Sequence, residues 1–212
     1  MKTNYLLIGV IILLTSCDSL GGSSNGKLTG TQSDVGTIGS TFAMSATGVT
    51  GVSNCQASVT TLSDGISTIS GSATITNNTI IQSLNAYQGE TFALNGNTLT
   101  LKNLKVKFTS DGIEKISGQN TGVIVNYNSS VGDTYSIPTK NTVRTVTAKS
   151  TTDSYAWGGM LIKTMEVSEP VNKCGVKRFT YVANHKWSIV ALIIEFDDNS
   201  TLKIPIVCSK SN

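Results

Sequence analysis

The chain has 212 residues, of which 16 are basic and 13 acidic, and its net charge at pH 7 is +3. So small a charge excludes an electrostatic basis for binding nucleic acid. Charged residues make up 14% of the sequence, compared with about a quarter in an average globular domain. Thr, Ser, Asn and Gly fill the polar positions instead. Because Thr favours pleated strands and Gly and Asn favour turns, the composition predicts an all-β protein.

The first residues, Met1–Cys17, have the pattern of an export signal. Lys2 precedes the apolar stretch Leu6–Leu14, which is shorter than the ~20 residues that a transmembrane helix needs. Small residues then lead to Cys17, and here the segment resembles the signal of bacterial lipoproteins. The resemblance implies that residues 1–16 are removed and that Cys17 carries fatty acyl chains such as palmitate. We therefore expect an anchor in the cell membrane or outer membrane, facing the periplasm or the cell exterior.

Residues 17–33 are rich in Gly and Ser and contain few large apolar side chains. This composition predicts a flexible tether that spans roughly 20–25 Å. Beyond the tether, we expect two β modules, at residues 34–122 and 123–212. Each is expected to be an antiparallel meander, and the two are expected to pack as a β-sandwich or as two curled, half-barrel-like sheets.

An internal duplication is the basis for proposing two modules. Four segments of the first module resemble segments of the second in the same order. The pairs are Gly39–Met44 with Gly132–Ile137, Gln56–Thr61 with Arg144–Lys149, Ile69–Ser72 with Ala156–Gly159, and Leu104–Asp111 with Leu192–Asn199.

Local patterns predict several strands and no helix of useful length. The pattern of Thr91–Phe108 predicts a hairpin that turns at Asn95-Gly96. The apolar residues of its second strand shift from odd to even positions, which predicts a bulge near Lys102-Asn103. Ile189–Ile194 is apolar at every position, as expected for a central strand covered on both faces. Around Pro205, apolar and polar residues alternate. Because proline has no backbone N–H, this pattern predicts an edge or terminal strand with one face in water.

With Cys17 assigned to lipid, the folded part has three cysteines, Cys55, Cys174 and Cys208. Export permits disulfides, but three cysteines allow only one pair. A meander over residues 176–207 would put Cys174 and Cys208 at opposite ends of the sheet, which argues against that pair. Pairing of Cys55 with either of the others, or no disulfide at all, stays open. No two cysteines are close in sequence and there is one histidine, so we expect no metal site and no cofactor.

The sequence contains no recognisable catalytic motif. His185 falls in a predicted hairpin turn, without the orienting partner and nucleophile that a catalytic base requires. Asp197–Ser200 is expected to form a turn, because Asp, Asn and Ser favour turns. Its spacing differs from that of an EF-hand calcium loop, so a calcium site is not expected. Glu166 and Glu169 are expected to lie at a solvated strand end. We therefore expect no enzymatic activity.

The second module holds a concentration of aromatic residues, for which there are two interpretations. On an exposed face, Trp157, Tyr181, His185 and Trp187 would provide a binding surface for a glycan or peptide. The alternative is that the aromatic residues form the core of the module, which otherwise has few large side chains to bury.

Three motifs of the second module resemble those of exported β-rich lipoproteins of Bacteroidota. They are Gly132–Tyr135 (GDTY), Trp157–Gly159 (WGG) and Tyr181–His185 (YVANH). The resemblance covers about residues 131–207 and implies export and a β-rich fold, with no particular activity. More distantly, the long antiparallel strands resemble the open half-barrels of periplasmic carriers of lipids and lipoproteins.

These observations predict a membrane-anchored lipoprotein of the cell envelope that acts as a non-enzymatic binding or structural module. Its expected partners are the membrane, through the lipid on Cys17, and another envelope protein or a glycan, but no nucleic acid. The alternative is a carrier that holds an apolar ligand in the cavity of a curled sheet. An envelope enzyme is the third possibility.

Overall fold

The computed structural model confirms the all-β prediction. It describes residues 28–45, 49–85, 92–116, 121–136, 143–173 and 175–210. The predicted signal and lipidation site, Met1–Cys17, lie outside the described residues, and so does Cys174.

Strands follow one another along almost the whole described chain. In order, the elements are η1 (Asp34–Gly36), β1 (Thr41–Met44), β2 (Val52–Ser63), β3 (Ile66–Ile75), α2 (Asn78–Asn85), β4 (Phe92–Asn95), β5 (Thr98–Thr109), β6 (Gly112–Ile116), β7 (Gly122–Asn126), β8 (Thr134–Ser136), β9 (Val143–Lys149), β10 (Tyr155–Trp157), β11 (Met160–Ile162), β12 (Met165–Lys173), β13 (Val176–Asn184), β14 (Ser188–Phe196) and β15 (Thr201–Ser209).

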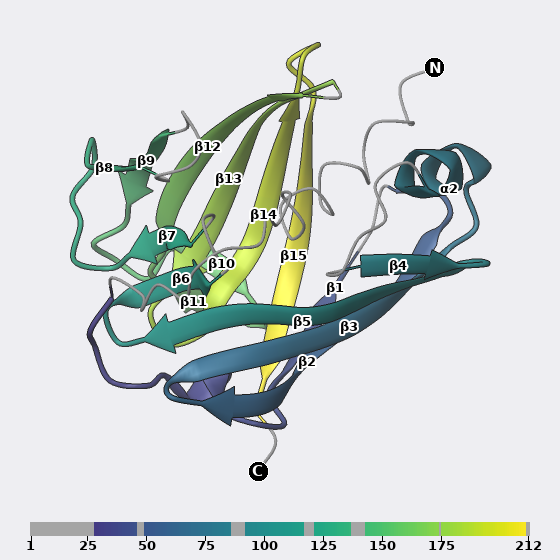
Figure 1. The fold of residues 1–212 in the computed structure, drawn as a ribbon. Helices are drawn as coiled ribbons and strands as arrows, with labels where there is room; N and C mark the ends of the chain where they lie inside the picture. The colour runs from purple at the N-terminus through teal and green to yellow at the C-terminus, as the bar shows by residue number, and fades with distance from the viewer. Residues whose placement is uncertain are drawn as a thin grey trace.

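Thirteen of these strands form one antiparallel sheet. Its order is β7-β6-β5-β3-β2-β1-β15-β14-β13-β12-β9-β8, with β4 paired to β5 beside this path. The first and last strands of the chain, β1 and β15, are neighbours, so the two halves of the sequence join in the middle of the sheet. In Figure 1, β2, β3 and β5 cross beneath the upright β12–β15, so the sheet curls and its halves face each other.

Side chains link the two ends of the sheet order, and the curled sheet is therefore nearly closed. Arg144 on β9 donates from Nη1 to the carbonyl oxygen of Val123 on β7, at 2.7 Å. Lys149 donates from Nζ to the carbonyl oxygens of Tyr127 and Ser129, at 2.9 and 2.8 Å.

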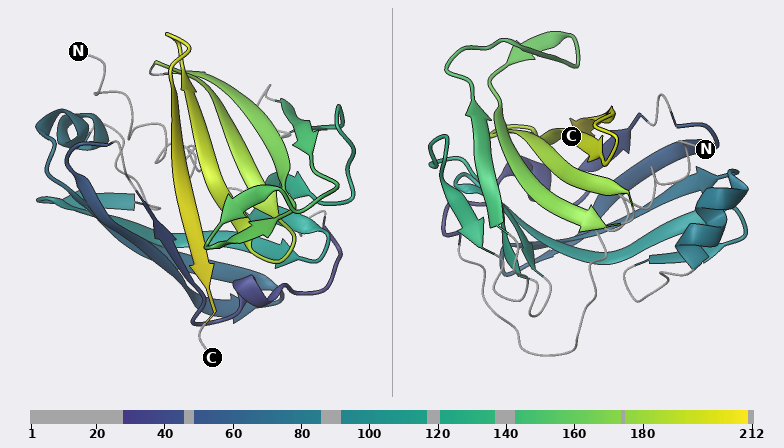
Figure 2. Two further views of the ribbon diagram at one scale, coloured as in Figure 1. Left: turned by 180° about the vertical axis from the view of Figure 1, so that it is seen from behind. Right: turned by 90° about the horizontal axis from the view of Figure 1, so that it is seen from above.

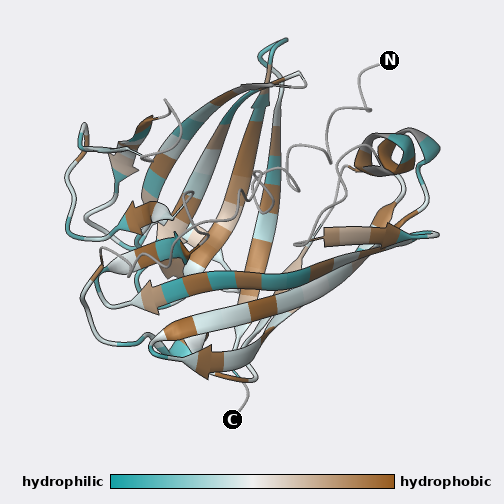
Figure 3. Cartoon of the chain, in the orientation of Figure 1, coloured by the Kyte–Doolittle hydropathy of each residue, from teal (hydrophilic) through white to brown (hydrophobic). Residues whose placement is uncertain are grey.

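The main apolar core lies between the two halves. Along several strands, such as β15, apolar and polar residues alternate, as Figure 3 shows by alternating bands. On β5, Leu104, Val106 and Phe108 point inward, and on the opposite half Phe179 and Ile194 meet them. Phe179 and Ile194 are 1% and 0% exposed, so these strands lie at the centre of the fold.

A second apolar cluster covers the outer face of β14. The β10–β11 hairpin lies across this face (Figure 2, left) and brings Trp157 and Ile162 against Val182, Val190 and Ala191. On the inner face, Leu192 and Ile194 belong to the main core. The prediction that Ile189–Ile194 is a strand covered on both faces is thus confirmed.

The predicted hairpin and bulge are also confirmed. β4 and β5 form the hairpin, turning at Gly96, which has a φ of +57°. In the pairing of β3 with β5, the register shifts between Leu101 and Leu104. The residue that absorbs the shift is Asn103, with a φ of +56°. Asparagine tolerates this left-handed conformation better than most residues, which suits it to a bulge.

The edge-strand prediction for the last strand is wrong, because β15 lies between β14 and β1. Pairing with β1 ends at Met44, and the next residue, Ser45, donates its N–H to the oxygen of Pro205 at 3.1 Å. Since the nitrogen and oxygen of one residue point to the same side of a strand, the missing N–H of Pro205 faces the end of β1, where little pairing is lost. The predicted wet face is confirmed, because Thr201, Lys203 and Pro205 are exposed.

The short helix α2 was not expected from the sequence. Asn77 caps it, with Oδ1 accepting the N–H of Ile80 at 3.3 Å. Ile80 and Leu84 are 0% and 1% exposed and pack against Phe92. A helix of this length depends on such packing more than on its own propensity. Because the packing partners lie outside the helix, the local sequence at Asn77-Asn78 has the pattern of a turn.

The folded part begins earlier than the predicted tether allows. Leu28 is 5% exposed, and its N–H donates to Oε2 of Glu114 at 3.1 Å. Further along, Ser33 donates its N–H to the oxygen of Phe108 at 2.9 Å. Residues 28–33 therefore lie along the β5–β6 hairpin rather than in a tether.

The four pairs of repeated segments correspond only in part. The first two pairs fall on the first two strands of each half, β1 with β8 and β2 with β9. The third pair does not correspond, because Ile69–Ser72 lies within β3 whereas Ala156–Gly159 spans the end of β10 and its turn. The expected boundary between residues 122 and 123 falls inside β7, which pairs with β6.

Candidate functional site

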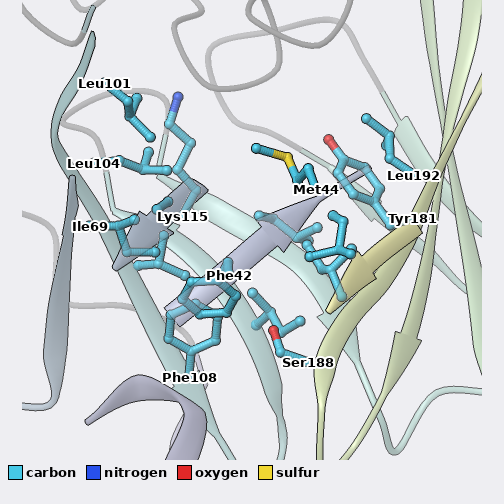
Figure 4. A pocket seen from close by; sticks show the side chains of 16 residues that line it. Phe42, Met44, Ile69, Leu101, Leu104, Phe108, Lys115, Tyr181, Ser188 and Leu192 are labelled. Atoms are coloured by element: carbon cyan, nitrogen blue, oxygen red, sulfur yellow. The ribbon is translucent and has the colours of Figure 1, made fainter. Parts of the chain in front are cut away.

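A cavity of about 160 Å³ lies between the two halves of the sheet. Figure 4 shows the side chains that surround it, which come from both halves. β1 and β5 contribute Phe42 and Phe108, whose rings stack with centroids 6.0 Å apart. From the other half, Leu192 on β14 and Ile206 on β15 point into the same space. The cavity therefore exists only because the sheet curls.

The wall of the cavity is almost entirely apolar. Of the sixteen described residues around it, Lys115, Tyr181 and Ser188 are the ones with polar side chains. Several of the apolar ones, such as Met44 and Leu101, are only half-buried, so the cavity is not sealed on all sides. An apolar cavity with a few polar groups is the usual form of a small-molecule site.

Lys115 brings a positive charge to this wall. It lies on β6 two residues after Ile113, so both side chains face inward, and it is 8% exposed. Lysine is rarely buried to this extent. The sequence alone did not single out Lys115, because a lysine in a short strand has the ordinary pattern of a solvated residue.

A buried charge network adjoins the cavity at Tyr181. Arg144 and Glu169 form an ion pair, with Nε to Oε2 at 2.7 Å and side chains 7% and 8% exposed. The Tyr181 hydroxyl donates to the same Oε2 at 3.0 Å. Burial and then the neighbouring Glu169 charge raise the pKa of Tyr181 well above its ordinary value.

The expectation that Glu169 lies at a solvated strand end is therefore wrong. β12 turns this carboxylate inward, where Arg144 on β9 and Tyr181 on β13 satisfy it. Buried carboxylates are tolerated when they are paired and hydrogen-bonded in this way. The three residues lie on three separate strands, so no local pattern could have identified the network.

The four residues of the predicted binding surface lie in three different environments. Tyr181 lines the inner cavity and is 6% exposed. Trp157, on the outer face, is 8% exposed and donates from Nε1 to the oxygen of Ile206 at 2.7 Å. Trp187 is half-buried beside it, with ring centroids 5.1 Å apart. His185 is exposed in the β13–β14 turn, as the sequence predicts. Trp157 and Trp187 adjoin each other, and Tyr181 lies on the opposite face of the sheet.

Of the three cysteines, the structure describes Cys55 and Cys208, and both are free thiols. Burial raises the pKa of Cys208 to about 11 and also raises that of Cys55. Both groups are therefore protonated and poorly nucleophilic at neutral pH. A disulfide between these two is excluded, and the alternatives that involve Cys174 lie outside the described residues.

The described segments contain no group of three or more His, Cys, Asp or Glu side chains placed to hold a metal ion. Asp198 acts as a turn former, as the sequence predicts, with Oδ1 accepting the N–H of Ser200 at 2.9 Å. Within the same segments, no helix is long and apolar enough to cross a membrane.

No protein family model matches this chain, and no curated protein or solved structure is significantly similar to it.

Proposed function

We propose that this protein is a non-enzymatic binding module that holds a small apolar ligand between the two halves of its sheet. The observation that supports this proposal is the apolar cavity of about 160 Å³. A cavity of about 150 Å³ lined by Leu, Ile and Phe in another protein accepts a benzene-sized molecule. The ligand's apolar part would thus be a single ring or a short alkyl chain, held by loss of apolar surface from water.

We further propose that the binding module is a lipoprotein of the bacterial cell envelope, anchored through Cys17. The lipoprotein-like pattern of Met1–Cys17 supports this part of the proposal. Since one acyl chain gives only marginal binding to a bilayer, stable anchoring requires at least two. The module would then take its ligand from the space next to the membrane or from the membrane itself.

Two adjacent residues on β15 test the cavity. Ile206 points into the cavity, whereas Val207 is 48% exposed on the opposite face. We expect the full chain to bind hexan-1-ol in isothermal titration calorimetry. Because Ile206→Trp fills the cavity, it should weaken binding by at least ~10-fold, as lost burial of about two methylene groups would.

Val207→Trp is the matched control and should bind hexan-1-ol like the wild type. Circular dichroism checks that both variants keep their strands. Absence of binding to the wild type, or unchanged binding to Ile206→Trp, would overturn the proposal.

A second candidate function is contact with an envelope protein or a glycan through the outer face. The observation that favours it is the tip of the β10–β11 hairpin, where Met160 and Leu161 are 45% and 60% exposed. Met160 pairs with Trp157, whose ring lies 5.1 Å from that of the half-buried Trp187. Exposed apolar side chains close to aromatic rings are typical of an interaction surface.

A further inference from the structure

We propose that the ligand of the cavity is a neutral ring compound with a hydroxyl group, such as a phenol, and that the Ser188 hydroxyl forms a hydrogen bond with it. This inference rests on the proposed function, because it requires that the cavity bind a ligand at all. It adds the chemical class of that ligand and the residue that recognises it.

The first argument is that Ser188 is a buried polar residue whose side chain is unpaired. It lines the cavity and is 2% exposed. Lys115 and Tyr181, which also lie in the wall, each have an interaction partner, which for Tyr181 is Glu169. Among the described residues, none forms a hydrogen bond with the Ser188 hydroxyl. Because a buried hydroxyl without a hydrogen bond is costly, a ligand that supplies this bond gains affinity.

The second argument is the backbone at Ser188, which turns the side chain inward. Neighbouring residues of a regular strand point to opposite faces of the sheet, but Ser188 and Ile189 both line the cavity. Ser188 has a φ of +63°, in the left-handed region that residues other than glycine rarely adopt. The register of β13 with β14 shifts between Val182 and Ala183, and Ala183 is the partner of Ile189. Irregularities of this kind re-aim side chains and are frequent beside functional sites.

The surroundings of Ser188 favour an aromatic ligand. Figure 4 shows Ser188 at the end of the cavity where Phe42 and Phe108 lie. These two rings stack with centroids 6.0 Å apart, and aromatic rings attract further rings at similar distances. A volume of about 160 Å³ accepts a single ring, since a cavity of about 150 Å³ takes up benzene. A ring held beside Phe42 and Phe108 would thus place a hydroxyl substituent within reach of Ser188.

The test compares two probes of nearly the same size, phenol and toluene, by calorimetry at neutral pH with the full chain. We expect the wild type to bind both. Ser188→Ala, which removes the hydroxyl, should weaken phenol binding ~5-fold, as loss of one hydrogen bond would, and change toluene binding by less than ~2-fold. Ser130, exposed between β7 and β8, provides the control, and Ser130→Ala should bind both probes like the wild type.

Ser188→Gly should show the same difference between the probes. It also lacks the hydroxyl, and because glycine adopts a positive φ readily, it decides the test if Ser188→Ala does not fold. Phenol binding that is unchanged in these variants, or that falls no more than toluene binding, would overturn this inference alone. A wild type that binds toluene but not phenol would do the same. If neither probe binds the wild type, the proposed function itself fails.

Discussion

At the scale of single residues, Arg144, Glu169 and Tyr181 form a buried polar network. Their charges and hydrogen bonds are satisfied within the network, and Arg144 also reaches the carbonyl oxygen of Val123 on β7. The network thus links β9, the strand next to one end of the sheet order, to β7 at the other end. Removing one partner of a buried ion pair leaves the other charge uncompensated, which is far more costly than losing a surface pair.

Tyr181 gives the network a signature in the pH dependence of stability. Because its pKa is raised in the folded state, the unfolded chain loses this proton first above about pH 10. The unfolded state then binds fewer protons than the folded state, so the free energy of unfolding falls as pH rises. In Tyr181→Phe this decline should be shallower by up to about 1.4 kcal/mol per pH unit.

Urea unfolding of both proteins between about pH 10 and about pH 11.5 measures the two slopes. Between about pH 7 and about pH 8 the slopes should coincide, which serves as the internal control. Identical slopes above about pH 10 would show that Tyr181 is not the group responsible.

At the scale of elements, the β10–β11 hairpin combines buried and exposed side chains. Trp157 is buried and hydrogen-bonded to Ile206, whereas Leu161 is 60% exposed. Trp157→Ala should therefore lower the free energy of unfolding by about 3–5 kcal/mol, the usual cost of removing a buried aromatic side chain. Leu161→Ser should change it by less than about 0.5 kcal/mol, as surface substitutions do.

Urea denaturation provides both values. A large loss for Trp157→Ala supports the core interpretation of this residue and argues against a binding role. If the free energy of unfolding of Trp157→Ala changes little, Trp157 would instead belong to the binding surface. Leu161→Ser is the stable variant with which contact to an envelope partner can be examined.

At the scale of the whole molecule, the chain is a meander whose first and last strands meet. β1 pairs with β15, and side chains of β9, the strand next to β8 at one end of the sheet order, reach β7 and Tyr127 at the other end. Facing halves make the central cavity, and residues 28–33 are held against the β5–β6 hairpin. The linker between Cys17 and the folded part is therefore shorter than its composition suggests.

The proposed anchor leads to a prediction for the whole protein in its cell. Cys17→Ala removes the thiol that would carry lipid, so the protein should move from the membrane fraction to the soluble fraction. Fractionation followed by immunoblotting measures this change, and Cys55→Ala is the control that should stay with the membrane. Membrane association of Cys17→Ala would refute the lipid anchor.

The sequence by itself determined the all-β class, the hairpin that turns at Asn95-Gly96 and the bulge at Asn103. These features follow from local signals, such as the two-residue period of apolar side chains and the left-handed preference of Asn and Gly. It also determined that Ile189–Ile194 is covered on both faces, because a run without polar residues has no side that favours water.

Only the tertiary structure decided which distant strands pair and which side chains meet. Pairing of β1 with β15 makes the strand of Pro205 an internal one. The same curl brings Arg144 to Glu169 and Lys115 to the cavity wall. Local patterns report whether a side chain faces water or a core, but they do not report which residues, far apart in the sequence, lie across that core. The cavity and the place of Lys115 in its wall are for that reason properties of the fold.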